Sequence, residues 1–507
     1  MEYEKIPAEQ FRFVQENKQL RDKELQTKSR SFFADAMIRF GKNKSSVIAA
    51  WILGFLILFS IVSPIISPFD IRNGDPIYIN YPPFFRAAAD MGLGFLDGAR
   101  SLDGQNDNSL AAFRGIAVET GLDPLIRVIG THESERVHKG QTVKTTTYDV
   151  EVNAYYQKGI IYRTFSYDDF KKLQEWQNET GIQVVYPYVE PQDISGISDN
   201  ANIWYKVDSK GVAVLDGDGN FIPAYSTSQD KAGAEYNSIR IPGDDGSYIY
   251  SYNKSGSVQC RVLYYNYYRY LNGLEPNYIM GTNALGQDIF CGIGVGARFS
   301  ILFAIFVSAI NLTIGAFYGA AQGYYGGWVD MLLDRISDIL SGVPFVVVTT
   351  LFQLHLAKKV GVVGSFLFAF VLTGWIGMAH LTRRQFYRFK GQEFILAART
   401  LGASDGRLMF KHIFPNGIGS IVTSCALVIP GVIGSETSMT YLGIVNLSNF
   451  AGTTIGTLLS QGNAVVTSAP HAILFPSIFL GLLMICFNLF GNGLRDAFNP
   501  TTRGVDD

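Results

Sequence analysis

Residues that could carry out chemistry are few in this chain, and they do not form a catalytic pattern. His132 and His138 stand six positions apart in a polar stretch without a cysteine or third histidine nearby, which argues against a metal site. The same long polar region has no G-x-S-x-G nucleophile motif. The whole chain has no G-x-x-x-x-G-K-[ST] phosphate-binding loop, and Gly41–Lys42 does not complete one. We therefore expect no enzyme active site and no ATP hydrolysis by this chain alone.

The acidic run Asp216–Asn220 (DGDGN) has a spacing of carboxylates that is typical of calcium loops. An EF-hand loop also needs a glycine at its sixth position and a glutamate at its twelfth. Counted from Asp216, those positions hold Phe221 and Thr227. We therefore interpret the run as a tight turn and expect no metal site and no bound cofactor on this chain.

The most informative segment is Glu393–Asn416, with the sequence EFILAARTLGASDGRLMFKHIFPN. Its first part predicts a short helix over Phe394–Leu401, with two small residues, Ala397 and Ala398, side by side. Gly402 is expected to end or bend that helix, because glycine readily adopts the left-handed conformation found just past helix ends.

The second part of the segment predicts another helix over Asp405–Phe414, capped by Ser404–Asp405. Pro415 is expected to break this helix just before the chain becomes apolar again. Small residues permit a close approach of backbones, so the hairpin could fit a groove on another protein. An ordinary basic loop held by lipid headgroups is the alternative, and the spacing by itself leaves both open.

The averages of composition look globular, but they conceal long tracts without charge. The 507 residues are 47% hydrophobic and 17% charged, with a mean hydropathy of +0.13. A bilayer core needs about 20 apolar residues of helix. Six stretches predict transmembrane spans: Val47–Ile66, Phe299–Ala320, Leu340–Leu356, Val362–His380, Ile418–Ser435 and Ile473–Phe490.

Charge and cysteine content exclude further classes of protein. Lysine and arginine number 42 against 44 aspartate and glutamate residues, so the formal charge of −2 predicts no general attraction to nucleic acid. Four cysteines are too few for a disulfide scaffold. Forty-six residues precede the first span, more than the basic start of a signal peptide, so we expect that span to remain as an anchor.

Positive charges beside the spans predict the side of the membrane that each segment occupies. Lysine and arginine cluster just before the first span, and seven of them lie in Leu381–Gly417, whereas Glu436–Ala472 has none. With six spans, this distribution predicts that both termini and the basic segment are cytoplasmic. Residues 67–297 are then outside the cell.

The outside region has the texture of a water-soluble α+β domain. Alternating hydrophobicity predicts strands at Tyr148–Tyr156 and Gly181–Val189, with a helix at Asp168–Glu179 between them. A small meander is predicted from three short strands separated by turns, Trp204–Val207, Val212–Leu215 and Phe221–Ala224. We interpret the tyrosine-rich run Val262–Tyr270 as a packed element rather than a platform for a sugar or peptide.

The segment Glu393–Asn416 resembles the EAA motif of ABC-importer permeases, an Ala-Ala pair followed by three residues, a glycine and a later proline. It matches best the form found in the dipeptide/oligopeptide permease family, in which A-A-R-x-L-G-A-S and R-H-I-x-P-N recur. Here these are Ala397–Ser404 and Lys411–Asn416. Leu396 replaces the glutamate of the motif, which weakens any role for that carboxylate. The resemblance implies a coupling helix that inserts into an ATPase subunit.

Other segments resemble the same family in the same order: Ser31–Asp70, Gly281–Ser300, Ser438–Gly443, Ser460–Gly462, Ala469–Pro470 and Asn488–Pro500. Asn283 and Gln287 replace an acidic and a basic residue of the family pattern, and Asn492 and Asn499 each replace an aspartate. The matches suggest the C-type partner of the two oligopeptide permeases. The region between Tyr81–Pro83 and Gly281 departs from the family and stays unexplained by it.

The resemblance implies an α-helical polytopic membrane protein, similar to type I ABC importer permeases, with six transmembrane helices and an inserted extracytoplasmic α+β domain. We expect a cytoplasmic helical lead at 1–46, the first transmembrane helix at 47–66, the inserted domain at 67–280, a permease core with five helices at 281–491 that includes the coupling loop 381–417, and a cytoplasmic tail at 492–507.

The function implied by the resemblance is that of a permease subunit of a bacterial cytoplasmic-membrane importer for oligopeptides or dipeptides, which forms half of the translocation path. The implied partners are a second homologous permease, two P-loop ATPases that use ATP and Mg, an extracytoplasmic substrate-binding lipoprotein and membrane lipid, but no nucleic acid. The residues expected to couple to the ATPase are Ala397, Ala398, Arg399, Leu401, Gly402, Ala403, Ser404, His412 and Pro415.

Two alternatives remain open at the level of the sequence. Nickel permeases share these motifs, and metal cargo would favour histidine or carboxylate side chains facing a pore; His355 and His380 are the only histidines at span edges. An external sensor on a six-span anchor would explain the large outer domain, but it would need a cytoplasmic output domain that we do not expect here.

Overall fold

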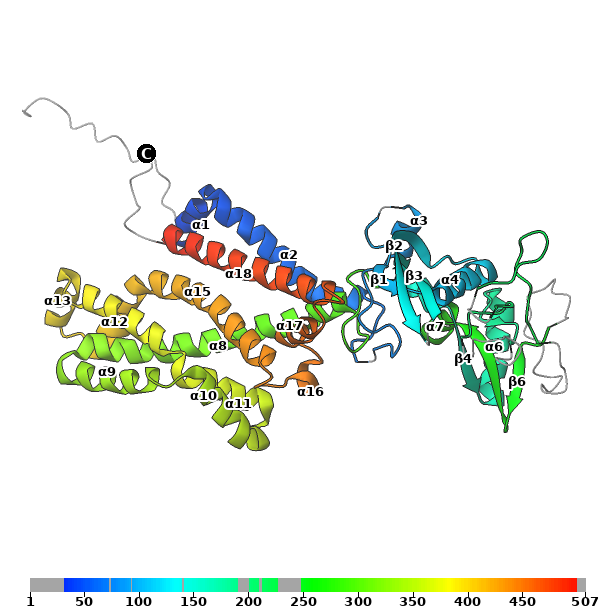
Figure 1. The fold of residues 1–507 in the computed structure, drawn as a ribbon. Helices are drawn as coiled ribbons and strands as arrows, with labels where there is room; N and C mark the ends of the chain where they lie inside the picture. The colour runs from blue at the N-terminus through cyan, green and yellow to red at the C-terminus, as the bar shows by residue number, and fades with distance from the viewer. Residues whose placement is uncertain are drawn as a thin grey trace, which may run out of the picture.

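The structure, a computed structural model, describes residues 32–498 except 73, 93, 139–140, 190–199, 209–211 and 227–247. Figure 1 shows an elongated bundle of helices with a smaller domain of sheets and helices at one end. The chain passes once along the bundle, leaves it to build the outer domain, and then returns to complete the bundle.

The described residues contain five helices long and apolar enough to cross a membrane, or six if one bent pair of helices counts as a span. They are α2 (Lys44–Ile66), α8 (Ile289–Tyr325), α11 (Ala357–Thr373) continued by α12 (Ile376–Lys390), α15 (Phe414–Tyr441) with the turns before it, and α18 (His471–Phe498). The predicted α-helical polytopic class is confirmed.

The third predicted span, Leu340–Leu356, is not one helix. It divides into the end of α9 (Gly327–Ser341) and α10 (Phe345–His355), and the two helices are bent by 75° at the break. Pro344 lacks a backbone N–H and disfavours helical geometry at the residue before it, which explains the break. The predicted span Val362–His380 runs from α11 into α12 across the turn at residues 374–375. The remaining four predicted spans lie within longer helices, because helices continue past the apolar stretch into polar residues.

Close contact between α8 and α12 fixes the centre of the bundle. Gly315, Gly319 and Gly323 recur at every fourth position of α8 and face α12. A Cβ atom on Gly319 would lie 2.1 Å from the carbonyl oxygen of Ala379, and one on Gly323 would lie 2.5 Å from Cβ of Phe386. Glycine therefore lets the two backbones touch, as small residues do in membrane helix pairs.

Helices α2 and α18, which come from opposite ends of the chain, pack against each other in the bundle. Ser46 of α2 donates a hydrogen bond to the Leu489 carbonyl at 3.1 Å, and Phe40 packs edge-on against Phe490. Phe40 belongs to α1 (Phe32–Lys42), residues 1–31 of the predicted helical lead lie outside the described residues, and its last residues, 43–46, cap and begin α2. Two short helices, α16 (Ser448–Ala451) and α17 (Ile455–Ala464), occupy the segment before α18.

The outer domain is α+β, as predicted. One antiparallel sheet has the order β1 (Ala99–Gln105), β3 (Gln141–Asn153), β2 (Leu125–His138). The other has the order β4 (Ile160–Phe165), β7 (Ser257–Leu263), β5 (Val185–Tyr186), and β6 (Ser251–Lys254) also pairs with β7. The helices of the domain are α3 (Arg86–Asp90), α4 (Asp107–Thr120), α5 (Ala154–Gln157), α6 (Tyr167–Thr180) and α7 (Tyr264–Asn272).

Several predictions for this domain need correction at their edges. The strand predicted at Tyr148–Tyr156 ends at Asn153. The Asn153 side-chain oxygen accepts hydrogen bonds from the backbone N–H groups of Tyr155 and Tyr156 and thereby caps the start of α5. The strand predicted at Gly181–Val189 is reduced to two paired residues. The helix predicted at Asp168–Glu179 is confirmed as α6.

The predicted meander forms only single bridges, Tyr205–Pro223, Val207–Ala213 and Leu215–Phe221, rather than continuous strands. The turn within it is confirmed. Asp216 Oδ1 accepts hydrogen bonds from the backbone N–H groups of Asp218 and Asn220, at 3.0 and 2.8 Å, so that carboxylate organises its own loop.

A cluster of buried aromatic residues joins the outer domain to the two connections that lead to the bundle. Its members include Tyr78, Tyr155, Tyr264, Tyr268 and Tyr278, so the tyrosine-rich run is a packed element, as predicted. The Tyr78 ring meets its tyrosine neighbours edge-on or tilted at centroid distances near 5 Å, for example 5.0 Å to Tyr264.

The chain leaves the bundle for the outer domain and returns to it side by side. Phe84 donates its backbone N–H to the Tyr278 carbonyl at 2.8 Å, and Arg86 forms an ion pair with Glu275 at 2.5 Å. Closer to the bundle, the Thr282 hydroxyl accepts a hydrogen bond from the Tyr81 backbone N–H of the outgoing segment. The two connections therefore form one support.

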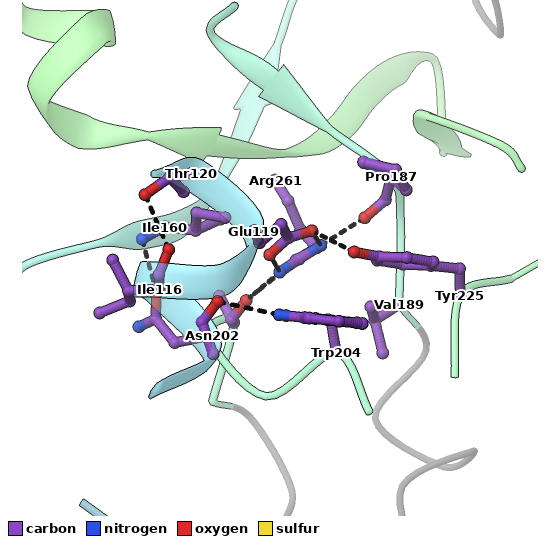
Figure 2. Close-up of polar contacts among 12 residues, drawn as sticks. Ile116, Glu119, Thr120, Ile160, Pro187, Val189, Asn202, Trp204, Tyr225 and Arg261 are labelled. Atoms are coloured by element: carbon purple, nitrogen blue, oxygen red, sulfur yellow. Dashed lines mark hydrogen bonds and ion pairs between the residues drawn. The ribbon is translucent and has the colours of Figure 1, made fainter. Parts of the chain in front are cut away.

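Arg261 of β7 is fully buried and joins the two halves of the outer domain (Figure 2). Its Nη2 lies 2.8 Å from Oε2 of Glu119 on α4, and its guanidinium donates to the carbonyls of Ala201 and Pro187. Tyr225 donates to the other carboxylate oxygen of Glu119 at 2.8 Å. Burial alone would lower the pKa of Arg261, but the Glu119 charge outweighs burial and keeps this pKa above its ordinary value.

The substitution Glu119→Gln tests this ion pair. It leaves a buried guanidinium without its counter-charge, and we expect the free energy of unfolding of the outer domain to fall by about 3 kcal/mol. Scanning calorimetry of the full chain measures the change. Arg127→Gln is the matched control, because Arg127 pairs with Glu151 but is 68% exposed, and we expect almost no shift. Equal shifts for both variants would contradict this role.

Candidate functional site

The candidate coupling segment, residues 391–416, lies at the end of the bundle farthest from the outer domain (Figure 1). It begins with α13 (Glu393–Thr400), which follows α12 after a two-residue turn. The helix predicted over Phe394–Leu401 is confirmed within one residue at each end.

Gly402 ends α13 in a Schellman motif. Its backbone φ is +84°, its N–H donates to the Arg399 carbonyl at 3.0 Å, and the Ala403 N–H donates to the Ala398 carbonyl at 3.1 Å. Ala398 and Ala403 also pack against the same apolar cluster, as the two flanking residues of this motif commonly do. The predicted role of Gly402 as the end of the helix is confirmed.

The second helix of the segment differs from the prediction. Residues Asp405–Arg407 (α14) pass into a π-helical turn, Leu408–Ile413, and this turn continues directly into α15. Pro415 does not break the helix. It lies in the first turn of α15, and we attribute its tolerance to the wider π-helical turn before it, which relieves the clash of the proline ring with the preceding turn.

The inner side of the segment is anchored to α8. Ile395, Leu408 and Ile413 are completely buried in a cluster with Tyr324 and Phe386. These contacts fix the position of α13 relative to the ends of α8 and α12.

Polar contacts reinforce the same anchor. The Tyr324 hydroxyl donates a hydrogen bond to the Asp405 carboxylate at 2.5 Å and accepts one from Arg399 at 3.3 Å. Ser404 occupies the N-cap position of α14, as predicted, but its side chain makes no capping bond. Asp405 is therefore used to hold the segment on α8.

The outer side of the segment presents apolar groups that the described residues leave exposed. Leu401 is 87% exposed, and Phe394 and Leu396 are about half exposed. Of the predicted coupling residues, those exposed are Ala397, Arg399, Leu401, Gly402, Ser404 and Pro415, and those half-buried are Ala398, Ala403 and His412. The structure thus places all nine on one short segment, while Phe394 was absent from the prediction although its spacing from Ala397 could have indicated it.

A polar cluster next to the segment was also absent from the prediction. Arg383 of α12 bonds to Asp330 and Asp334 of α9 at 2.6 and 2.8 Å, and the Tyr387 hydroxyl donates to Asp330 at 2.6 Å. The sequence placed the two aspartates before the third predicted span and Arg383 in the basic segment, without pairing them. The helical spacing of Arg383 and Tyr387 is the signal that could have paired them with α9.

A groove within the bundle contains polar but uncharged side chains. It has a volume of about 360 Å³ and is lined by Asn311, Phe345, Phe370, Thr373, Gly374, Val428, Gly431, Val432 and Ser435. Asn311 lies in the apolar run of α8, is 1% exposed, and its side-chain oxygen has no hydrogen-bond partner. A polar amide in such an apolar run indicates a functional site, and this indication was already visible in the sequence.

Substitution of Gly402 by alanine tests the geometry of the segment. Alanine in the left-handed conformation costs about 1 kcal/mol, and we expect the amide hydrogen of Ala403 to exchange about fivefold faster in mass-spectrometric hydrogen exchange. Gly406→Ala is the control, because Gly406 is helical and its Cβ would also meet open space. The same acceleration in both variants would contradict the assigned role of Gly402.

Two family models match the chain. The binding-protein-dependent transport system inner membrane component matches residues 311–504, and the N-terminal transmembrane domain of oligopeptide transport permease C matches residues 31–83. A solved structure of the MetNI methionine ABC transporter in an inward-facing form is 13% identical and covers 42% of this chain and 98% of that one, with a TM-score of 0.35.

Curated relatives match over much of their length. The oligopeptide transport system permease protein OppC of Bacillus subtilis is 39% identical over 236 residues, which is 46% of this chain and 76% of the relative. The dipeptide transport system permease protein DppC of the same species is 34% identical over 224 residues, 44% of this chain and 68% of the relative. The glutathione transport system permease protein GsiD of Escherichia coli is 33% identical over 241 residues, 48% and 78% respectively. This chain therefore belongs to the family of binding-protein-dependent transport system inner-membrane components, in its oligopeptide permease C branch.

Proposed function

We propose that this chain is the transmembrane permease subunit of an ABC importer for oligopeptides or dipeptides, and that it forms half of the translocation path. The observation that carries the proposal is the match to permeases named for oligopeptide and dipeptide transport, at 33–39% identity. As a family member it is a multi-pass inner-membrane transport subunit rather than the ATPase.

The coupling segment is the proposed contact with a partner ATPase. Its exposed apolar side offers Leu401, Phe394 and Leu396 to another protein, while its buried side is held on α8 through Tyr324 and Asp405. An anchored base with a free apolar face is the arrangement that lets an outside movement reach the spans. Closure of two ATPases on ATP and Mg would then shift α8, α12 and α15 against one another and alternate the access of the path.

The groove in the bundle supports peptide rather than metal cargo. Its partly exposed polar members, Thr373 and Ser435, offer hydrogen-bonding groups without charge, which suits a peptide backbone. Nickel would favour histidine or carboxylate ligands, and no such residue lines this groove in the described chain. His355 is exposed. His380 lies near the start of α12, and its Nδ1 is 3.9 Å from the carboxylate of Asp334.

The proposed assembly contains this chain, a second homologous permease, two ATPases and an extracytoplasmic substrate-binding protein. Family membership implies ATPase and substrate-binding partners in general. We place both termini and the coupling segment in the cytoplasm and the outer domain outside, because segment and domain occupy opposite ends of the bundle (Figure 1). The outer domain is proposed to orient the binding protein or to guard the outer mouth.

A polar substitution at Leu401 tests the coupling role. Leu401→Ser removes exposed apolar area without touching the buried cluster, so we expect the chain to fold normally while co-purification of the ATPases and peptide uptake fall at least fivefold. Pull-down of the assembly and uptake into vesicles measure the two effects.

The structure provides a matched control at the other end of α15. Leu442 is 60% exposed and also precedes a left-handed glycine, Gly443, in a turn with the same hydrogen bonds as the end of α13. Leu442→Ser should leave ATPase co-purification unchanged. If Leu401→Ser retains the ATPases and full uptake, the segment does not couple.

The proposed topology is tested with a membrane-impermeant maleimide. Three native cysteines are buried and Cys425 is half-buried, so an introduced exposed thiol should dominate labelling. In intact cells we expect the S134C variant, on β2, to be labelled and the S404C variant to be protected until the membrane is opened. Labelling of both, or the reverse pattern, would overturn the assigned sides.

A further inference from the structure

A cavity lies at the junction between the outer domain and the bundle, outside the coupling segment and the groove described above. It has a volume of about 760 Å³. Its walls come from the outgoing connection, from strand β1 and from the residues at the start of α18, and they comprise Ile79, Asn80, Pro82, Pro83, Ala99, Arg100, Ser101, Leu102, Thr467, Ser468, Pro470 and His471. This volume is within the range of small-molecule sites, about 300–1,000 Å³.

The electrostatic character of this junction cavity is positive. Arg100 lines it, and no aspartate or glutamate occurs among the lining residues of the described chain. The guanidinium is held in place, because one Nη2 donates to the Asn80 carbonyl at 2.6 Å and the group lies 4.9 Å from the Tyr81 ring centroid. The N-terminus of α18 borders the same space and adds positive partial charge.

The wall of the junction cavity also carries uncharged hydrogen-bonding groups. The hydroxyls of Ser101, Thr467 and Ser468 stand around the same space and can donate or accept.

We propose that the junction cavity binds the C-terminal carboxylate of a peptide before the peptide enters the path. Arg100 pairs with the carboxylate, and the hydroxyls of Ser101, Thr467 and Ser468 offer acceptors for the N–H of the last peptide bond. A fixed guanidinium near hydroxyl acceptors matches the end of a peptide, which presents an anion and a donor a few atoms apart. The absence of lining carboxylates argues against a metal ion or an amine as the ligand.

This inference rests on the proposed peptide transport, and it names a site on the outer side for the same substrate class. The volume favours a small ligand over a protein surface, because protein contacts are broad and flat. An acidic side chain of the substrate-binding protein is the competing source of a carboxylate. The experiment below separates the two sources.

The test measures peptide binding to the complete membrane assembly in nanodiscs without the substrate-binding protein. The probes are trialanine and its C-terminal amide, followed by isothermal titration. We expect the wild-type assembly to bind the free acid at least tenfold more tightly than the amide, which corresponds to about 1.4 kcal/mol. Arg100→Gln should remove this preference and Arg100→Lys should keep part of it. Arg127→Gln, an exposed arginine on β2, should leave the preference unchanged.

Ser468→Trp provides a second variant that leaves Arg100 in place. Ser468 is exposed at the cavity wall, so the indole should fill the space without disturbing the core, and the free-acid preference should disappear. Retention of that preference in both Arg100→Gln and Ser468→Trp would overturn the site, as would its absence in the wild type. Weaker docking of the substrate-binding protein without a change in trialanine binding would assign the pocket to a protein partner and overturn it too.

Failure of the site and failure of the proposed function give different results. If the site is wrong, the wild-type assembly still takes up peptides and the variants do so equally well. If the function is wrong, the energised wild-type assembly with its binding protein takes up no peptide at all, whatever the titrations show.

Discussion

Backbone contact between α8 and α12 is the constraint on which the rest of the structure depends. Three glycines at every fourth position allow that contact, and any side chain there would collide with a carbonyl or a Cβ atom of α12. Helix α8 has 37 residues and is therefore about 55 Å long, longer than a bilayer core. One rigid element thus begins next to the outer domain and ends at Tyr325, and its Tyr324 holds the coupling segment.

The sequence was sufficient for the features that depend on local chemistry. Apolar runs located the membrane helices, and Gly402 located the end of α13, because a left-handed turn and a long apolar helix each have a residue signature. The break at Pro344 was missed, since hydrophobicity alone does not register a missing N–H. The continuation through Pro415 was missed for the opposite reason, because a π-helical turn is set by three-dimensional packing and has no simple pattern.

Contacts between distant segments were beyond prediction. The ion pair of Arg261 with Glu119 joins residues 142 positions apart, and Arg383 finds its aspartates only after α9 has folded back on α12. The predicted meander has single bridges instead of continuous strands, because its short segments pack on α4 through aromatic rings and do not form a ladder. The polar residues of the groove could be identified in the sequence, but the sequence did not show that they line the same groove.

The paired exit and return of the chain at Phe84 and Tyr278 has a consequence for the history of the molecule. Because the two strands of this stem are already hydrogen-bonded to each other, material grafted beyond it adds no loop-closure cost to the membrane part. The outer domain can therefore be gained, shortened or exchanged during evolution without a change in the spacing of the bundle helices.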